Sequence, residues 1–160
     1  SAMPGAFPII QKAFETIGFA KVATSAKEAQ AIGYLQKDDS IVVNRDYIIS
    51  EAKAEVLSMS KNYVKPDIET FKLPGKSGRL VLDGTLKGFV KSGKISEHDA
   101  LIGRRLGYVL TGGDKGGPFT SVDEQYLLDI EREMFVSLAG EQKSIERIEY
   151  MLKRGKPLRN

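Results

Sequence analysis

SVDEQYLLDIEREMFVSLAGEQKSIERIEYMLKRGKPLRN, residues 121–160, carries the clearest structural signal in this 160-residue chain. Its first half has a stripe of apolar residues at helical spacing: Leu127, Ile130, Met134 and Leu138. Its second half has a similar stripe: Ile145, Ile148 and Leu152. Ser121 with Glu124 is typical of a helix start, and Gly140 of a helix end. Because Gly155 and the proline after it end the second pattern, the stretch predicts two amphipathic helices.

The chain is basic beyond the second helix and holds no acid there. The cations are Lys153, Arg154, Lys156 and Arg159. Such a cluster can bind a phosphate or a nucleotide. Cations at the end of a helix also complement its dipole without any ligand. The residues alone leave both interpretations open.

The rest of the chain repeats the helical pattern. Helices are expected at residues 7–20, 26–32, 47–62, 79–91 and 97–110, several of them with capping residues. The third would bury a stripe at Ile48, Ala52, Glu55 or Val56, and Met59. Gly84 and Gly88 lie one turn apart, where they could admit a neighbouring helix. Only the β-branched run at residues 41–43 suggests a strand, so we expect a mainly α fold with at most one short strand.

Two loops separate these helices. Residues 65–78 hold two prolines and two glycines, and are the best candidate for a linker. Residues 111–119, TGGDKGGPF, follow a helix and lack the GK[ST] ending of a phosphate-binding loop. We interpret them as a helix cap at Gly112 and Gly113 followed by a flexible connection.

Composition narrows the class of protein. A mass of 17.6 kDa suits one domain, and no apolar run is long enough to span a membrane. The net charge is only +3, and basic and acidic residues are mixed along most of the chain, so no nucleic-acid partner is expected. The absence of cysteine fits a reducing cytoplasm. No signal peptide is seen, and residues 1–3 are typical of a cloning remnant.

No residue stands out as catalytic or metal-ligating. His98, the only histidine, falls in the first turn of a predicted helix, where we expect it at the surface. The acidic pairs lie on helices beside lysines and arginines, which is typical of solvated faces. We therefore expect neither a catalytic residue nor a metal site.

Two segments resemble the crotonase superfamily, in the part that follows the active-site half. Residues 20–35, AKVATSAKEAQAIGYL, match the family pattern at Ser25, Ala26, Glu28, Ala29 and Gly33. Residues 40–60 are similar to the alanine-rich helix that follows, although Val42-Val43-Asn44 lacks the usual proline. Residues 131–157 resemble the terminal crotonase helices.

Three further strings resemble the C-terminus of a family with two activities, the bacterial 3-hydroxyacyl-CoA dehydrogenase/enoyl-CoA hydratases of fatty-acid β-oxidation. They are KSGKISEHDALIGRRLGYVLTGG at residues 91–113, VDEQYLLDIERE at 122–133 and MLKRGKPLRN at 151–160. The resemblance implies a crotonase-like segment at residues 4–66, a family-specific insertion at 67–120 and a terminal helical pair at 121–160. It also implies that the parent protein uses NAD and a CoA thioester.

The resemblance further implies a structural role for this chain. The dinucleotide fingerprint G-x-G-x-x-G is absent, and the oxyanion hole of crotonases belongs to segments not matched here. We therefore expect no bound cofactor and no activity by itself. The expected partners are the dehydrogenase and crotonase regions of the same polypeptide and a second copy of the protein. Lys153, Arg154 and Lys156 would face the phosphates of CoA, and Tyr150 would stack on its adenine.

The rival hypothesis is a free-standing helical adaptor that binds a protein or an anionic partner. The native gene separates the two: a dinucleotide fingerprint encoded upstream of Ser1 supports the enzyme, whereas a start codon at Met3 supports the adaptor.

Overall fold

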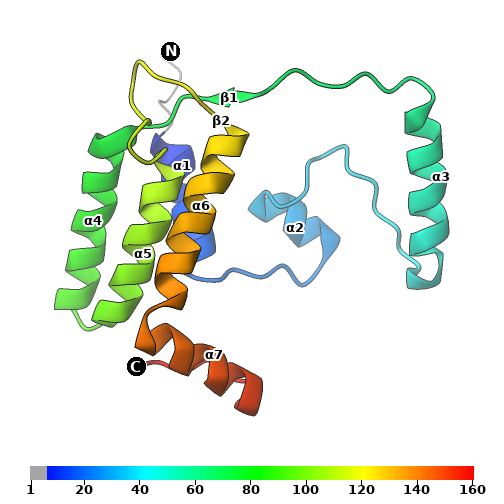
Figure 1. Ribbon diagram of the computed structural model, residues 1–160. Coiled ribbons are helices and arrows are strands. Elements are labelled where there is room, and N and C mark those ends of the chain that lie inside the picture. The colour runs from blue at the N-terminus through cyan, green and yellow to red at the C-terminus, as the bar shows by residue number, and fades with distance from the viewer. Residues whose placement is uncertain (1–6) are drawn as a thin grey trace. The chain divides into compact units, whose positions relative to one another are not determined.

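The computed structural model describes residues 7–160; the expected cloning remnant at residues 1–3 and the start of the first expected segment at residue 4 lie outside them. The chain forms two compact units, one of residues 7–19 and 68–160 and one of residues 20–67. Both are built of helices joined by loops, which confirms the mainly α fold class (Figure 1). The division at residues 4–66, 67–120 and 121–160 stays a prediction.

The larger unit has its core where three helices meet: α1 (Phe7–Gly18), α4 (Gly75–Lys91) and α5 (Glu97–Leu110). The buried core residues are Ile10 and Phe14 of α1, Leu82 and Leu86 of α4, and Ala100 of α5. The close approach of helices occurs on α5. A Cβ built on Gly103 would lie 2.7 Å from Leu86 Cδ2, whereas nothing lies within 4 Å of one built on Gly84 or Gly88. The expected role of Gly84 and Gly88 was therefore wrong.

Helix α6 (Glu124–Ala139) packs on α5, and its apolar stripe faces inward as predicted. Ile130 is buried, and Leu127, Met134 and Leu138 are half-buried. The expected capping residue was wrong, because Asp123 and not Ser121 accepts the hydrogen bond, from the backbone of Tyr126 at 2.8 Å.

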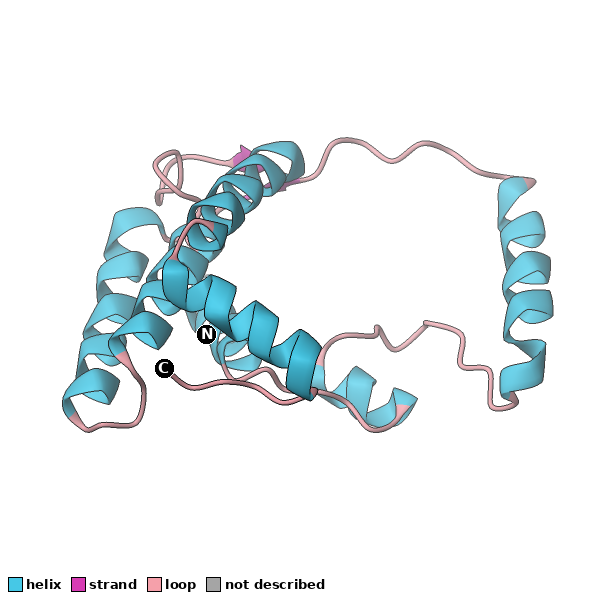
Figure 2. Ribbon diagram, turned by 60° about the horizontal axis from the view of Figure 1, so that its bottom comes forward, coloured by secondary structure: helices cyan, strands magenta, loops and turns pink. Residues whose placement is uncertain are grey.

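A short antiparallel pair of strands closes one end of this unit (Figure 2). Strand β1 (Thr70–Phe71) pairs with β2 (Val122–Asp123), Phe71 lying opposite the buried Val122. The expectation of at most one strand, at residues 41–43, was wrong: the structure assigns no strand there. Helix α4 begins inside the expected linker, at Gly75, which takes a left-handed conformation (φ 62°) against the backbone of Gly116.

The smaller unit, residues 20–67, holds α2 (Ala26–Ile32), the 3₁₀ turn η1 (Arg45–Tyr47) and α3 (Ile48–Ser60). Helix α2 begins and ends as predicted. Ser25 accepts from the backbone of Glu28, and Gly33 ends the helix in a left-handed conformation. None of residues 20–67 is buried, so the buried stripe expected on α3 was wrong.

Across residues 7–160, no helix is both long enough and apolar enough to cross a bilayer.

Candidate functional site

The expected binding residues lie at the end of α7 (Gln142–Arg154) and just beyond it. Lys153 forms an ion pair with Glu149 at 3.0 Å, and both side chains are exposed. Gly155 ends the helix with φ 64° and donates its N–H to the carbonyl of Met151. Arg154 and Lys156 are exposed and make no ion pair within residues 7–160. The four predicted residues thus share one exposed helix end.

The apolar face of α7 is exposed rather than packed. Ile145 is 38% exposed, Ile148 52% and Leu152 82%, and Tyr150 lies among them at 37%. The helix therefore presents a cationic end and an apolar side to whatever adjoins it. An exposed apolar surface of this kind is typical of a site that contacts another protein surface.

One arginine fixes the inner end of α7 to α5. Arg147, whose side chain is only 19% exposed, donates to Asp99 at 2.7 Å and to the Asn160 side chain at 2.8 Å. Asp99 also accepts from the backbone of Ser96, in a capping box at the start of α5. Burial by itself would raise the pKa of Asp99, but the hydrogen bonds from Ser96 and Arg147 outweigh it and lower that pKa.

His98 lies in the same junction and not at the surface. It is 5% exposed, and its Nε2 shares a 3.0 Å hydrogen bond with Ser144 Oγ of α7. Sequence reasoning missed this because residues 98 and 144 are far apart along the chain. Burial lowers the pKa of His98, and the positive charges of Arg147 and Lys143 lower it further.

The His98–Ser144 pair lacks the rest of a nucleophilic site. A catalytic histidine needs an acid that orients its second nitrogen. The adjacent acid, Asp99, is instead engaged by Ser96 and Arg147. The pair therefore joins two helices, α5 and α7.

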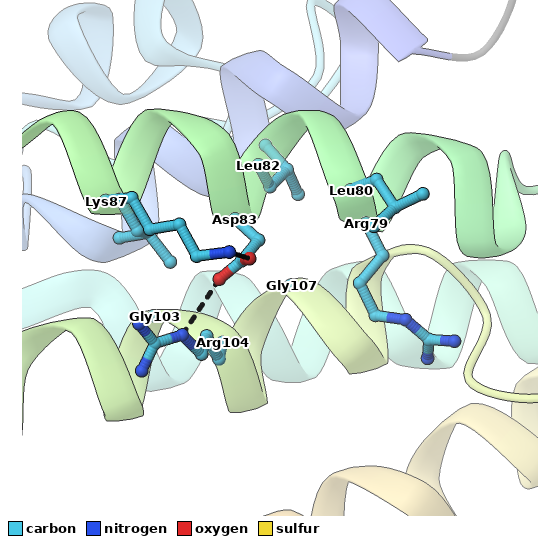
Figure 3. Close-up of a pocket in the computed structure, with 9 residues that line it drawn as sticks. Arg79, Leu80, Leu82, Asp83, Lys87, Gly103, Arg104 and Gly107 are labelled. Carbon is cyan, nitrogen blue, oxygen red and sulfur yellow. Dashed lines mark hydrogen bonds and ion pairs between the residues drawn. The ribbon is translucent and has the colours of Figure 1, made fainter.

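A second polar cluster lines a cavity of about 370 Å³ between α4 and α5 (Figure 3). Asp83 accepts from Lys87 and from Arg104 Nε, both at 2.8 Å. These bonds, first Lys87 and then Arg104, lower the pKa of Asp83. A carboxylate held ionised by two cations is a poor general acid or base near neutral pH. This cavity thus offers mainly apolar contact, from Leu82 and Leu86.

The glycine-rich loop uses its own amides internally. Gly112 and Gly113 cap α5 in left-handed conformations, as expected, and donate to Val109 and Tyr108. Gly116 donates to the carbonyl of Gly112 at 2.7 Å, and a Cβ built on Gly116 would clash with the Thr111 carbonyl oxygen. The loop is therefore packed rather than flexible, and these amides are not free to bind phosphate. Nor do residues 7–160 gather three or more potential metal ligands.

Comparison with known proteins gives one relative. The chain is 46% identical over 151 residues to the probable 3-hydroxyacyl-CoA dehydrogenase of Bacillus subtilis (strain 168). The match covers 93% of this chain and 19% of the relative, so the chain spans about a fifth of that protein's length. No family model and no solved structure matches the chain. The relative's name agrees with the dehydrogenase part of the sequence resemblance and does not mention a hydratase.

Proposed function

We propose that this chain is a helical, non-catalytic C-terminal part of a 3-hydroxyacyl-CoA dehydrogenase/enoyl-CoA hydratase of fatty-acid β-oxidation. The observation that carries the proposal is the 46% identity, along nearly the whole chain, to one fifth of a probable 3-hydroxyacyl-CoA dehydrogenase. The parent enzyme would use NAD and a CoA thioester. The crotonase half rests on the sequence resemblance alone. The proposed cytoplasmic location rests on the absence of cysteine, which fits a reducing compartment.

The chemistry of the polar clusters supports a structural role. The single imidazole is buried against Ser144, and the carboxylate of Asp83 is neutralised by two cations. Neither group is available to transfer a proton to or from a substrate. Catalysis would therefore belong to the other regions of the parent.

The exposure of residues 20–67 supports packing against the rest of the parent. Helix α3 has 13 residues and buries none of them, although it carries Ile49, Val56, Leu57 and Met59. Isolated helices of this length are marginal in water. A covering surface is needed, and the relative has about four fifths of its length outside the match. Residues 20–67 would thus form an arm that packs on the crotonase core.

Activity assays test the non-catalytic role. We expect the isolated chain to give no turnover with crotonyl-CoA, or with acetoacetyl-CoA and NADH. The full-length parent should turn over both. Activity of the isolated chain above buffer background, lost on denaturation, would contradict the proposal.

The cationic end of α7 is proposed to contact the phosphates of CoA in the parent. Arg154 and Lys156 are exposed without an ion pair in residues 7–160, and Lys153 has only the exposed Glu149. Contacts between a cation and phosphate contribute roughly 1.5–3 kcal/mol when partly desolvated and less when exposed. The exposed position of these side chains favours the lower end.

Alanine substitution of Lys153, Arg154 and Lys156 in the parent tests this contact. We expect a higher KM for enoyl-CoA, an increase of about tenfold corresponding to 1.4 kcal/mol, with kcat nearly unchanged. High salt should shrink the difference from the wild type, because it screens the wild-type contact. A matched triple substitution at exposed lysines of the other helices, Lys12, Lys76 and Lys91, should leave KM unchanged. Equal KM values for the two triple variants would contradict the contact with CoA and leave these cations with the role of capping the end of α7.

A further inference from the structure

A second cavity of about 440 Å³ is bordered by α4, α5 and α6. Three of the residues that line it are arginines. The lining residues are Arg79, Leu101, Arg104, Arg105, Tyr108 and Met134. Arg79 comes from α4, and Met134 from α6. In Figure 3 the Arg79 side chain extends away from the Asp83 cluster, with its guanidinium group clear of it.

The three arginines differ in whether their charge is already matched. Arg104 is satisfied by Asp83 at 2.8 Å. Arg79 lies over the Tyr108 ring, 4.9 Å from its centroid, and reaches Asp114 only at 3.7 Å, on a carboxylate that is 81% exposed. Arg105 forms no ion pair within residues 7–160.

Two of these groups keep a buried nitrogen without a hydrogen-bond partner among residues 7–160: Arg79 Nη1 and Arg105 Nε. Buried polar groups are nearly always hydrogen-bonded, and an unpaired donor on a charged group is especially costly. The two side chains that carry these donors come from neighbouring helices and line the same cavity. Guanidinium groups match the oxygens of carboxylates and phosphates in both charge and geometry.

We propose that this cavity binds a small molecule through an oxyanion group, a carboxylate or a phosphate, held by Arg79 and Arg105. Leu101 and Met134 would contact an apolar part of the same ligand. The volume is in the range typical of small-molecule sites. This site is separate from the cationic end of α7 and does not depend on the proposed function.

The competing partner inside the protein is an acid on α6. The negative charge of Glu133 is close enough to contribute to the raised pKa of Tyr108, behind burial and the hydrogen bond and charge of Asp114. Glu133 nevertheless forms no ion pair with Arg105 within residues 7–160. Its negative charge would repel a bound anion without holding Arg105 in place. The substitution Glu133→Gln, which removes this charge, should therefore strengthen anion binding.

Titration of the isotope-labelled chain with inorganic phosphate, and separately with succinate, tests the site at constant ionic strength. We expect saturable shifts of the arginine Nε–H resonances, assigned by their loss in Arg79→Gln and Arg105→Gln. Each of these variants should bind at least about tenfold more weakly, a loss of about 1.4 kcal/mol. Arg132→Gln removes the same charge from an exposed position on α6 and should bind as the wild type does.

The two anions identify the ligand class. Saturation by phosphate alone assigns a phosphate group, saturation by succinate alone assigns a carboxylate, and either supports the site. Glu133→Gln should bind more tightly than the wild type, and this variant tests the site even if Arg79→Gln does not fold. Absence of saturable binding of both anions, or equal binding by wild type and Arg105→Gln, would overturn the proposal.

Discussion

Burial of the His98 imidazole makes the junction of α5 and α7 sensitive to acid. Its pKa lies below the ordinary value of 6.5, because the ring is buried and faces Arg147 and Lys143, whose effect exceeds that of the acids Glu141 and Asp99. The unfolded chain thus binds a proton more readily than the folded chain does. Stability from this residue is complete above pH 6.5 and is lost as the pH falls toward the folded pKa.

His98→Gln tests this at the level of one residue. Glutamine keeps an amide for Ser144 but does not titrate. We expect the free energy of unfolding of the wild type to fall between pH 7 and pH 5, by about 1.4 kcal/mol for each unit of pKa difference, and that of the variant to fall much less. Asp83 and Asp99 have lowered pKa values and stay ionised in this range. Denaturant unfolding at each pH measures the free energy of unfolding of both proteins. Parallel pH profiles for the wild type and the variant would contradict the role assigned to His98.

The residue scale is also where prediction from sequence failed most. The helix expected at residues 97–110 begins where predicted, because its capping box of Ser96 and Asp99 is a local feature. The contact of His98 with Ser144 and that of Asp99 with Arg147 each join residues more than forty positions apart in the sequence. Nothing in the local pattern signals such contacts. The same is true of the Arg79–Arg105 cavity, which exists only because three helices meet.

At the scale of elements, the absence of a side chain at Gly103 lets α4 and α5 approach closely. Gly84 and Gly103 both lie inside helices, but nothing lies within 4 Å of a Cβ on Gly84, whereas one on Gly103 would lie 2.7 Å from the buried Leu86. Alanine favours the helix over glycine by about 0.5–1 kcal/mol. Overpacking a core costs typically 1–3 kcal/mol.

The same substitution should therefore have opposite effects at the two positions. We expect Gly84→Ala to raise the free energy of unfolding by about 0.5–1 kcal/mol, and Gly103→Ala to lower it by about 1–2 kcal/mol net. Chemical denaturation with a helical circular dichroism signal measures both. Destabilisation by Gly84→Ala would show that α4 has a partner on that face, and a neutral Gly103→Ala would show that Leu86 can move away.

Helices were predictable where periodicity and caps agree, as at α2, α5 and α7. The strand expected at residues 41–43 did not form, because β-branched residues make a strand only when another strand supplies hydrogen bonds. The actual pair, Phe71 opposite Val122, joins segments about fifty residues apart. The periodicity of α3 predicted the helix, but none of its residues is buried in the part of the chain that the structure describes.

At the scale of the whole molecule, the two units differ in self-sufficiency. The unit of residues 7–19 and 68–160 has its own core, around Phe14, Leu82 and Leu86. None of residues 20–67 is buried, so their helices depend on a surface outside residues 20–67. Local unfolding is expected wherever buried apolar contacts are few. The central claim is that this surface belongs to the parent polypeptide.

Hydrogen–deuterium exchange of α3 in the isolated chain and in the full-length parent tests that claim most directly, with α5 as the internal reference. We expect α3 amides to exchange nearly unprotected in the isolated chain while α5 is protected. In the parent, α3 should slow at least about tenfold, which corresponds to about 1.4 kcal/mol. Exchange of α3 at the same rate in both proteins, whether fast or slow, would contradict the account.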